Sequence, residues 1–261
     1  MKEIVTKVEL NTIYNEDCLQ GMKRIPDGAV DCIICDLPYG VLNKGNQSAQ
    51  WDNIIPFEPL WEQYERVIKD DGAIVLFASG MFTADLMTSN RKLWRYNLIW
   101  KKGKRSTGFL NANKMPLRNH EDIVVFYKKS PTYNPQMTKG TATHHRSGSQ
   151  SAKNQCYGSF KILPTLYTND KFPTSIVDIE KEHVTGGFFH PTQKPIALIG
   201  YLIKTYTNEG ETVLDNCMGS GTTAVAAIRT RRNFIGFELQ KEYYDIATKR
   251  IKEEQQQLNL F

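Results

Sequence analysis

The chain has 261 residues, of which 40% are hydrophobic and 23% charged, and its formal net charge is +5 at pH 7. A chain of this length can bury roughly 75% of its unfolded surface, which leaves room for a large α/β domain with an insertion and argues against a disordered protein. It contains no run of ~18 apolar residues, and residues 1–5 lack the apolar core of a signal peptide, so we expect a cytoplasmic protein without a membrane partner.

The positive charge is concentrated in the middle of the chain. Residues 91–169 contain fifteen Lys and Arg but only two acidic residues, Glu121 and Asp122, and the remainder is net acidic. A basic segment on an acidic body is typical of a protein that binds a polyanion, although surface lysines also serve solubility. We therefore expect nucleic acid as the partner.

The cysteines and histidines predict no metal site. Five scattered cysteines do not indicate a disulfide framework. Cys32 and Cys35 have the Cys-x-x-Cys spacing inside an apolar run, so we expect buried packing, with metal or redox chemistry as the alternative. His144, His145 and Cys156 do not have the spacing of a standard metal site.

The first third of the chain predicts alternating strands and helices that end in a motif. In chain order we expect a strand at 13–14, a helix at 16–24, a strand at 29–36, a helix ending at Asp70, a strand at 73–78 and a helix at 81–90. The second strand ends in Asp36-Leu37-Pro38-Tyr39-Gly40, at the edge where open α/β sheets bind ligands. An acid, a rigid proline and an aromatic ring suit a flat substrate such as a nucleobase, and a simple turn is the alternative. The polar segment 41–50 is interpreted as a loop that closes over substrate.

The middle of the chain predicts two strands and a basic insertion. The runs at 96–100 and 123–127 are β-rich, and the basic loop between them is interpreted as facing phosphate. Prolines and glycines interrupt 130–189, which we interpret as an insertion that contacts DNA, with a flexible basic surface segment as the alternative. The residues expected to contact DNA are Lys101, Lys102, Lys104, Arg105, Arg118, Lys139, His144, Arg146 and Lys153.

The last third predicts a nucleoside-binding arrangement. After a helix at 196–206, a strand at 212–215, a glycine turn, a helix at 224–229 and a strand ending at Glu238 follow the order of a Rossmann half. Gly219 and Gly221 let the backbone approach a ligand, and Glu238 can accept hydrogen bonds from ribose hydroxyls. The third glycine of the dinucleotide motif is absent, and Asp215 suits a cationic ligand. These features favour S-adenosylmethionine, which carries an ammonium and a sulfonium.

Together, 36–39, the His-Pro-Thr-Gln-Lys-Pro element at 190–195 and 215–223 resemble the motifs of the DNA amino-methyltransferases in their beta arrangement. The resemblance implies an α/β fold, a Rossmann-like methyltransferase sheet with helices on both faces and permuted motif order. It divides the chain into a catalytic half at 1–129, a basic target-recognition insertion at 130–189 and a cofactor-binding half at 190–261.

The resemblance also implies roles for the catalytic residues Asp36, Leu37, Pro38 and Tyr39. The family usually has Asp-Pro-Pro-Tyr, and its second position is thought to act through its carbonyl, so leucine can serve. An initial Asp goes with adenine, so the expected reaction is methyl transfer to N6 of an adenine flipped out of double-stranded DNA, with Tyr39 stacked on the base.

The resemblance further places Asp17 and Cys18 at the adenine of the cofactor, and Gln193 or Lys194 at its methionine end. A helix cap for Asp17 and a solvated surface lysine for Lys194 are the alternatives. The full expected cofactor site is Asp17, Cys18, Gln193, Lys194, Asp215, Met218, Gly219, Ser220, Gly221, Thr222, Thr223 and Glu238.

Other functions remain open at this point. An N4-cytosine or RNA methyltransferase uses similar motifs, and a non-catalytic DNA-binding module with a degenerate Rossmann core is an alternative from another class. A nicotinamide dehydrogenase is disfavoured by the absent third glycine. A homodimer and a partner restriction enzyme are left open.

Overall fold

A computed structural model describes residues 7–41, 52–104, 106–141, 150–154, 156, 158–162, 169–180 and 193–258. The chain divides into two compact units. The first unit comprises Met1–Asn134 and Ser175–Phe261, and the second comprises Pro135–Thr174. The larger unit contains every residue of the site described below.

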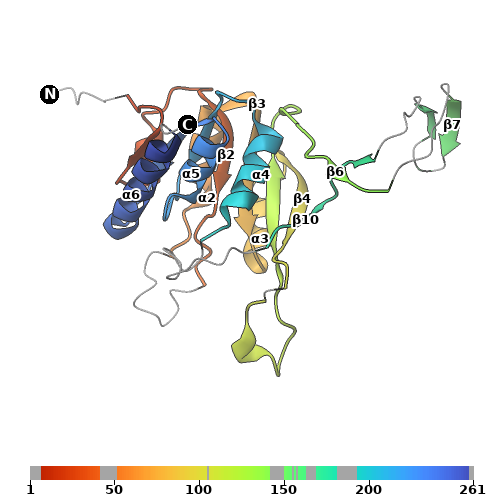
Figure 1. Cartoon of the computed structure of the whole chain (residues 1–261), viewed down its shortest axis with the longest axis horizontal. Coiled ribbons are helices and arrows are strands. Elements are labelled where there is room, and N and C mark those ends of the chain that lie inside the picture. Colours follow the sequence, from red (N-terminus) through yellow and green to blue (C-terminus); the bar gives the residue numbers. More distant parts are fainter. Residues whose placement is uncertain are drawn as a thin grey trace. The chain divides into compact units, whose positions relative to one another are not determined.

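The larger unit is built on one eight-stranded sheet (Figure 1). Its strands, in spatial order, are β1 (Thr12–Tyr14), β12 (Asn233–Phe237), β11 (Thr212–Asp215), β2 (Val30–Cys35), β3 (Ile68–Ala78), β5 (His120–Phe126), β4 (Trp94–Lys101) and β10 (Ile176–Asp178). Neighbouring strands are parallel except where β5 pairs with β3 and β4. The carboxyl ends of the seven parallel strands therefore meet the amino end of β5 at one edge of the sheet.

The chain order reverses between β2 and β11. From β2 the chain passes through α2 (Phe57–Val67) to β3 on one side, and from β11 it passes through α5 (Thr222–Arg229) to β12 on the other. The paired residues Val213 and Cys32, and Leu214 and Ile33, hold these two strands side by side. Open α/β sheets bind ligands in the crevice at such a reversal. The strand ends that carry Asp36 and Asp215 flank it.

Helices cover both faces of the sheet (Figure 1). The helices α1 (Cys18–Met22), α2 and α3 (Met81–Ser89) bury residues in one core, and α4 (Ile196–Tyr206), α5 and α6 (Lys241–Leu258) bury residues in the other. Alternate residues of β2 follow the same division: Ile33 and Cys35 belong to the first core, and Cys32 and Ile34 to the second. The predicted fold class, a Rossmann-like sheet with helices on both faces, is confirmed.

Among the boundaries that differ from those expected, two change how the sheet and the insertion are divided. Strand β3 begins at Ile68 and not at residue 73, because Val30 pairs with Ile68 before the register shifts to the pairing of Cys32 with Ala73. Strand β10 lies inside the expected insertion 130–189 but belongs to the main sheet, because Val177 pairs with Trp100 of β4 and is buried. The second compact unit therefore spans 135–174, which is shorter than the predicted insertion.

The smaller unit contains two antiparallel strand pairs in its described residues. Strand β6 (Thr138–Lys139) pairs with β9 (Asp170–Lys171), and β7 (Gln150–Asn154) pairs with β8 (Gly158–Ile162). In the part of the chain that the structure describes, no helix is long and apolar enough to cross a membrane.

Candidate active site

The carboxyl edge of the sheet encloses a cavity of about 590 Å³ in the larger unit. Its wall contains all four predicted catalytic residues, Asp36, Leu37, Pro38 and Tyr39. It also contains the predicted cofactor residues other than Gly221, which is the N-cap of α5. The fold therefore brings the two sequence motifs, about 180 positions apart in the chain, to one cavity.

The turn after β2 is held in shape by a buried acid. Asp52 is 2% exposed. Its Oδ1 accepts hydrogen bonds from the backbone N–H of Tyr39 at 2.8 Å and of Gly40 at 3.0 Å, and its Oδ2 accepts one from Val41 at 2.7 Å. Gly40 has φ +68°, a conformation that favours glycine. Sequence reasoning missed Asp52, which follows the polar segment 41–50 and acts through contacts with residues 39–41, eleven to thirteen positions earlier in the chain.

Both oxygens of the Asp36 carboxylate are engaged. The Tyr39 hydroxyl donates a hydrogen bond to Oδ1 at 2.9 Å, and the Lys194 ammonium donates one to Oδ2. The Asp36 side chain remains 23% exposed toward the cavity that it lines. The Tyr39 ring stacks on Phe82 with centroids 4.8 Å apart, so one face of this ring is covered inside the protein. The stacking of Tyr39 on a flipped base stays a prediction.

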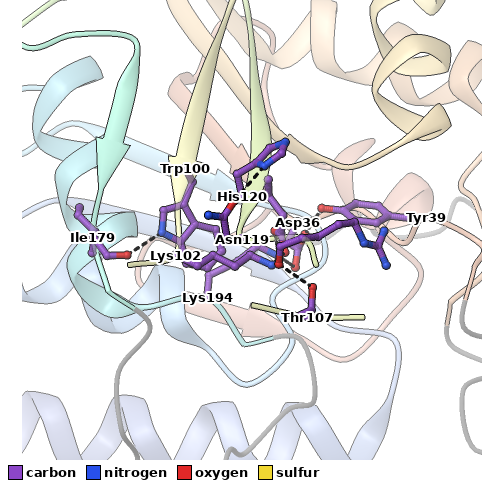
Figure 2. A network of polar contacts seen from close by, with 11 residues as sticks. Asp36, Tyr39, Trp100, Lys102, Thr107, Asn119, His120, Ile179 and Lys194 are labelled. Atoms are coloured by element: carbon purple, nitrogen blue, oxygen red, sulfur yellow. Dashed lines mark hydrogen bonds and ion pairs between the residues drawn. The ribbon is translucent and has the colours of Figure 1, made fainter. Parts of the chain in front are cut away.

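Two carboxylates and two ammoniums alternate along the cavity wall. Lys194 Nζ lies 3.4 Å from Glu121 Oε2, and Lys102 Nζ donates to Glu121 Oε1 at 2.5 Å. Lys102 also lies over the Trp100 ring, 5.3 Å from its centroid. Figure 2 shows Lys194 and Lys102 in one polar network with Asp36 and Tyr39. Glu121, at the amino end of β5, was missed by sequence reasoning.

The structure places both lysines differently from their predicted environments. Lys102 is only 6% exposed, so the expectation that it lies on an open loop facing phosphate is wrong. The ion pair with Glu121 replaces the water that its ammonium loses on burial. Lys194 is 7% exposed, which rules out the solvated surface lysine, and its ammonium contacts Asp36.

The charges shift one another's proton affinities. Burial raises the pKa of Asp36, and Lys194 offsets only part of this effect. Burial alone lowers the pKa of Lys194, but the carboxylates of Asp36 and Glu121 bring it above its usual value. Burial raises the pKa of Glu121, but Lys194 and Lys102 outweigh it and hold that pKa below its usual value. At neutral pH Lys194 and Glu121 are therefore charged.

On the other side of the reversal, Asp215 closes the glycine turn. Its Oδ1 accepts from the Cys217 backbone N–H at 3.0 Å, and its Oδ2 accepts from the Thr223 hydroxyl at 2.6 Å. Burial raises the pKa of Asp215 to about 6. The Asp215 carboxylate in the wall of the cavity suits a cationic ligand. The predicted cofactor residue Thr223 is thus seen to orient Asp215.

Glu238 lies at the end of β12 opposite the same turn. Its Oε2 accepts from the Gly219 backbone N–H at 2.7 Å and its Oε1 from that of Gln240 at 2.8 Å. Burial raises the pKa of Glu238. Gly219 and Gly221 have φ +54° and +84°, and a Cβ on Gly221 would lie 2.9 Å from that of Ala247. Both backbone conformations therefore favour glycine, and at Gly221 a side chain would also collide with Ala247.

The remaining cofactor residues surround this turn. Asp17 is the N-cap of α1, accepting from the Gln20 N–H at 3.1 Å, so the alternative reading of Asp17 is confirmed while its side chain also lines the cavity. Ser220 donates to Gln193 at 3.1 Å. Asn216, buried and missed by sequence reasoning, accepts from the Tyr64 hydroxyl at 2.5 Å. The cavity wall also contains Cys18, Met218 and Thr222.

The predicted DNA-binding residues are spread over several parts of the chain. Arg118 lines the cavity, and its backbone pairs with Thr107 at the base of the loop between β4 and β5. Lys104 is exposed on this loop, and Lys101 forms an ion pair with Asp178 at 2.6 Å. Lys139, in the smaller unit, pairs with Asp170 at 2.5 Å. Arg105, His144, Arg146 and the side chain of Lys153 lie outside the described residues.

No group of residues suited to a metal ion occurs in the described ranges. All five cysteines are free thiols, and Cys32 and Cys35 are buried in the two cores. The expected packing role of this pair therefore agrees with its position.

In this doubly wound sheet, the turn that carries Asp36 and the glycine turn after β11 lie at one reversal of the chain order. This arrangement is that of a Rossmann-like methyltransferase fold with permuted motif order. The chain belongs to the DNA methylase family, whose model matches residues 30–249. It is 30% identical over 253 residues to the DNA adenine methyltransferase YhdJ of Escherichia coli (strain K12), covering 93% of this chain and 83% of that one. It is 26% identical over 279 residues to the type II methyltransferase M.HinfI of Haemophilus influenzae, covering 97% and 71%.

Solved structures support the same fold. The M1.HpyAVI–SAM complex matches with a TM-score of 0.62 and 23% identity, covering 92% of this chain and 98% of that one. The PvuII DNA methyltransferase (cytosine-N4-specific) matches with a TM-score of 0.64 and 16% identity, covering 96% and 93%. The predicted family is confirmed.

Proposed function

We propose that this DNA methylase uses S-adenosylmethionine to methylate the N6 amine of an adenine in double-stranded DNA. The observation that carries the proposal is the position of the Asp36 carboxylate in the same cavity as Asp215, Glu238 and the glycine turn. An initial Asp in this motif favours adenine by resemblance, and the relative at 30% identity is named an adenine methyltransferase.

The glycine-turn side of the cavity holds the cofactor. The Asp215 carboxylate attracts the ammonium of S-adenosylmethionine, Glu238 accepts hydrogen bonds from its ribose hydroxyls, and Asp17 lies where its adenine is expected. The Glu238 carboxylate accepts backbone N–H groups of its own segment and of the glycine turn, and acceptor capacity remains on it for a ligand. S-adenosylmethionine supplies an electrophilic methyl group on its sulfonium.

Asp36 and Leu37 activate the substrate amine. The lone pair of an exocyclic amine is delocalised into the ring, so the amine is a poor nucleophile. Hydrogen bonds from its N–H groups to the Asp36 carboxylate and the Leu37 carbonyl concentrate that pair on nitrogen. A bond to a charged acceptor contributes ~1.5–3 kcal/mol, and more where water is excluded. Asp36 then takes the proton that the amine loses.

The paired amine is inaccessible inside a duplex, so the base is flipped out at a cost of a few kcal/mol. The loop between β4 and β5 begins at the cavity wall, to which Lys102 belongs. Figure 1 shows this loop extending beyond the strand ends. Residues 102–119 contain no acid, and Lys104, Lys114 and Arg118 are exposed on them. We assign this loop to the phosphate backbone beside the target base. The basic insertion is proposed to recognise the target sequence.

The experiment compares wild-type protein with Asp36→Ala, using labelled S-adenosylmethionine and duplex DNA. We expect the substitution to abolish methyl transfer while cofactor affinity and melting temperature are retained, because Asp36 lies on the substrate side of the reversal. Substantial transfer by the variant would overturn the mechanism. Absence of cofactor binding by the wild-type protein in calorimetry would overturn the proposed function itself.

A further inference from the structure

One buried carboxylate oxygen of the cavity wall, Glu121 Oε2, lacks a well-formed hydrogen bond in the described structure. Lys194 Nζ lies 3.4 Å from it, so the two groups make only a weak ion-pair contact. The partner oxygen of Glu121, Oε1, is held by Lys102. Leaving a buried acceptor unpaired is costly, so such a group in a native site calls for a functional explanation.

The position of Lys194 supplies a functional explanation for this oxygen. Its ammonium bonds to Asp36 Oδ2, while Oδ1 takes the Tyr39 hydroxyl. The substrate amine needs charge density on this same carboxylate, and a fully engaged ammonium withdraws it. The Lys194 ammonium therefore stabilises the Asp36 carboxylate while the site is empty, but during the reaction it weakens the interaction of this carboxylate with the amine.

We propose that Lys194 is a positioning residue shared by two carboxylates, and that Glu121 receives its ammonium when the target amine binds Asp36. This inference rests on the proposed function, in which Asp36 accepts the amine. Nζ has to move about half an ångström to reach the ~2.8 Å of a charge-assisted hydrogen bond to Glu121, and about one ångström or more to leave hydrogen-bonding distance of Asp36 Oδ2. A change in side-chain torsions of the lysine suffices.

The receiving carboxylate is itself held in place. Lys102 bonds to Glu121 Oε1 at 2.5 Å, and the Lys102 backbone N–H donates to the Asn119 carbonyl at 2.8 Å. Trp100, over which the Lys102 ammonium lies, donates its Nε1–H to the Ile179 carbonyl at 2.8 Å, as Figure 2 shows. The movement therefore belongs to Lys194, between two fixed acids.

The transfer leaves the buried charge balanced. Two carboxylates and two ammoniums are present before and after it, and Lys194 exchanges one hydrogen bond to a carboxylate for another. The exchange gives Glu121 Oε2 a well-formed hydrogen bond and frees Asp36 Oδ2. Binding of the amine, which replaces the lost donor on Asp36, thus favours the active arrangement.

Lys194 and Glu121 have opposite effects on the ionisation of Asp36. The groups that face Asp36 are Tyr39 and Cys35 from its own segment, Glu121 and behind it Lys102, Lys194 before α4, and Asp215 at the end of β11. Lys194 favours the ionised form of Asp36, and Glu121 disfavours it. Asp36 works as the carboxylate, so activity falls at low pH, where Asp36 is protonated. Removing Lys194 therefore moves this acid limb of the pH–activity profile to higher pH, and removing the Glu121 charge moves it to lower pH.

The test is the pH dependence of kcat, at saturating cofactor and DNA, for Lys194→Met, Glu121→Gln and the double variant. We expect the acid limb of Lys194→Met to move to higher pH and that of Glu121→Gln to lower pH. At neutral pH Glu121→Gln is expected to lower kcat tenfold or more with unchanged cofactor affinity, because Lys194 then stays on Asp36. The double variant returns the limb toward that of the wild-type protein.

Glu62→Gln and Lys252→Met, exposed on α2 and α6, are the matched controls and leave the limb unchanged. Shifts of both site variants in the same direction, or no shift in an active, folded variant, would overturn the inference. If Glu121→Gln does not fold, Glu121→Asp keeps the charge but withdraws it from Lys194, and an undiminished kcat would also overturn it. Inactivity of the wild-type protein would instead contradict the proposed function.

Discussion

Asp52 holds the turn that carries the substrate side of the site. Its three hydrogen bonds satisfy consecutive backbone N–H groups from Tyr39 to Val41. Each donor left unpaired on burial costs ~1–3 kcal/mol. We therefore predict that Asp52→Ala lowers the melting temperature by several degrees and reduces methyl transfer at least tenfold.

Thermal unfolding and methyl transfer to duplex DNA measure the two effects. Asp52→Asn keeps one acceptor oxygen and should recover part of each. Asp71→Ala, an exposed acid on β3, is the control for loss of charge alone. A melting temperature and activity equal to wild type for Asp52→Ala would contradict the role assigned to Asp52.

The raised pKa of Asp215 predicts how cofactor affinity depends on pH. With a pKa of about 6, this carboxylate is ionised at pH 7 and mostly neutral at pH 5. If its charge attracts the cofactor ammonium, affinity falls as pH decreases, by about tenfold between pH 7 and pH 5. Calorimetry across this interval measures the change. Asp215→Asn should bind weakly at both values, and a wild-type affinity that is independent of pH would contradict this assignment.

The sequence predicts those site residues that end a strand. Asp36, Asp215 and Glu238 each follow a buried run, and the sheet brings such ends to one edge. Asp52, Glu121 and Asn216 could not be predicted in the same way, because each acts through a contact with a segment distant in the chain. Their only sequence signal was a polar residue beside a predicted strand or motif.

Lys102 shows a different limit of prediction from the sequence. Lys102 stands in a run of basic residues, which predicts solvent exposure, yet its ammonium is buried against Glu121. Composition describes the average environment of a segment and carries no information about a single ion pair. The pairing depends on the meeting of β4 and β5 at the sheet edge.

At the scale of elements, the apolar periodicity predicts most of the sheet. Strands β2, β11 and β12 and the helices between them lie where expected, because their buried residues form uninterrupted runs or a helical stripe. Strand β10 could not be predicted, because it buries only Val177 of its three residues. It is defined by its partner β4 and not by its own composition.

The basic loop between β4 and β5 gives a prediction for DNA affinity. Replacing both Lys104 and Arg118 with alanine removes two exposed cations without touching the glycine turn. If both contact phosphate, the slope of log affinity against log salt concentration becomes shallower by about two. Fluorescence anisotropy with a labelled duplex measures the slope.

Cofactor affinity should not change in this variant. Lys23→Ala together with Lys252→Ala removes the same charge from elsewhere on the surface and is the matched control. Equal salt slopes for the loop variant and the wild-type protein would contradict a contact between this loop and phosphate.

At the scale of the whole molecule, the sheet topology brings together two motifs that lie far apart in the sequence. The catalytic motif lies in the first half of the chain and the glycine turn in the second, but β2 and β11 are neighbours, so the two motifs face one cavity. The most positively charged part of the chain connects these halves. A protein built in this way can hold a small charged cofactor on one side of a reversal and a polyanionic substrate on the other.

Asp36 is proposed to direct methylation to the N6 amine of adenine. The most direct measurement is expression in a host that lacks DNA methylation, followed by base-resolved sequencing and mass spectrometry of its DNA. We predict N6-methyladenine within one sequence motif for the wild-type protein and none for Asp36→Ala. N4-methylcytosine in its place, or N6-methyladenine that persists in the variant, would contradict it.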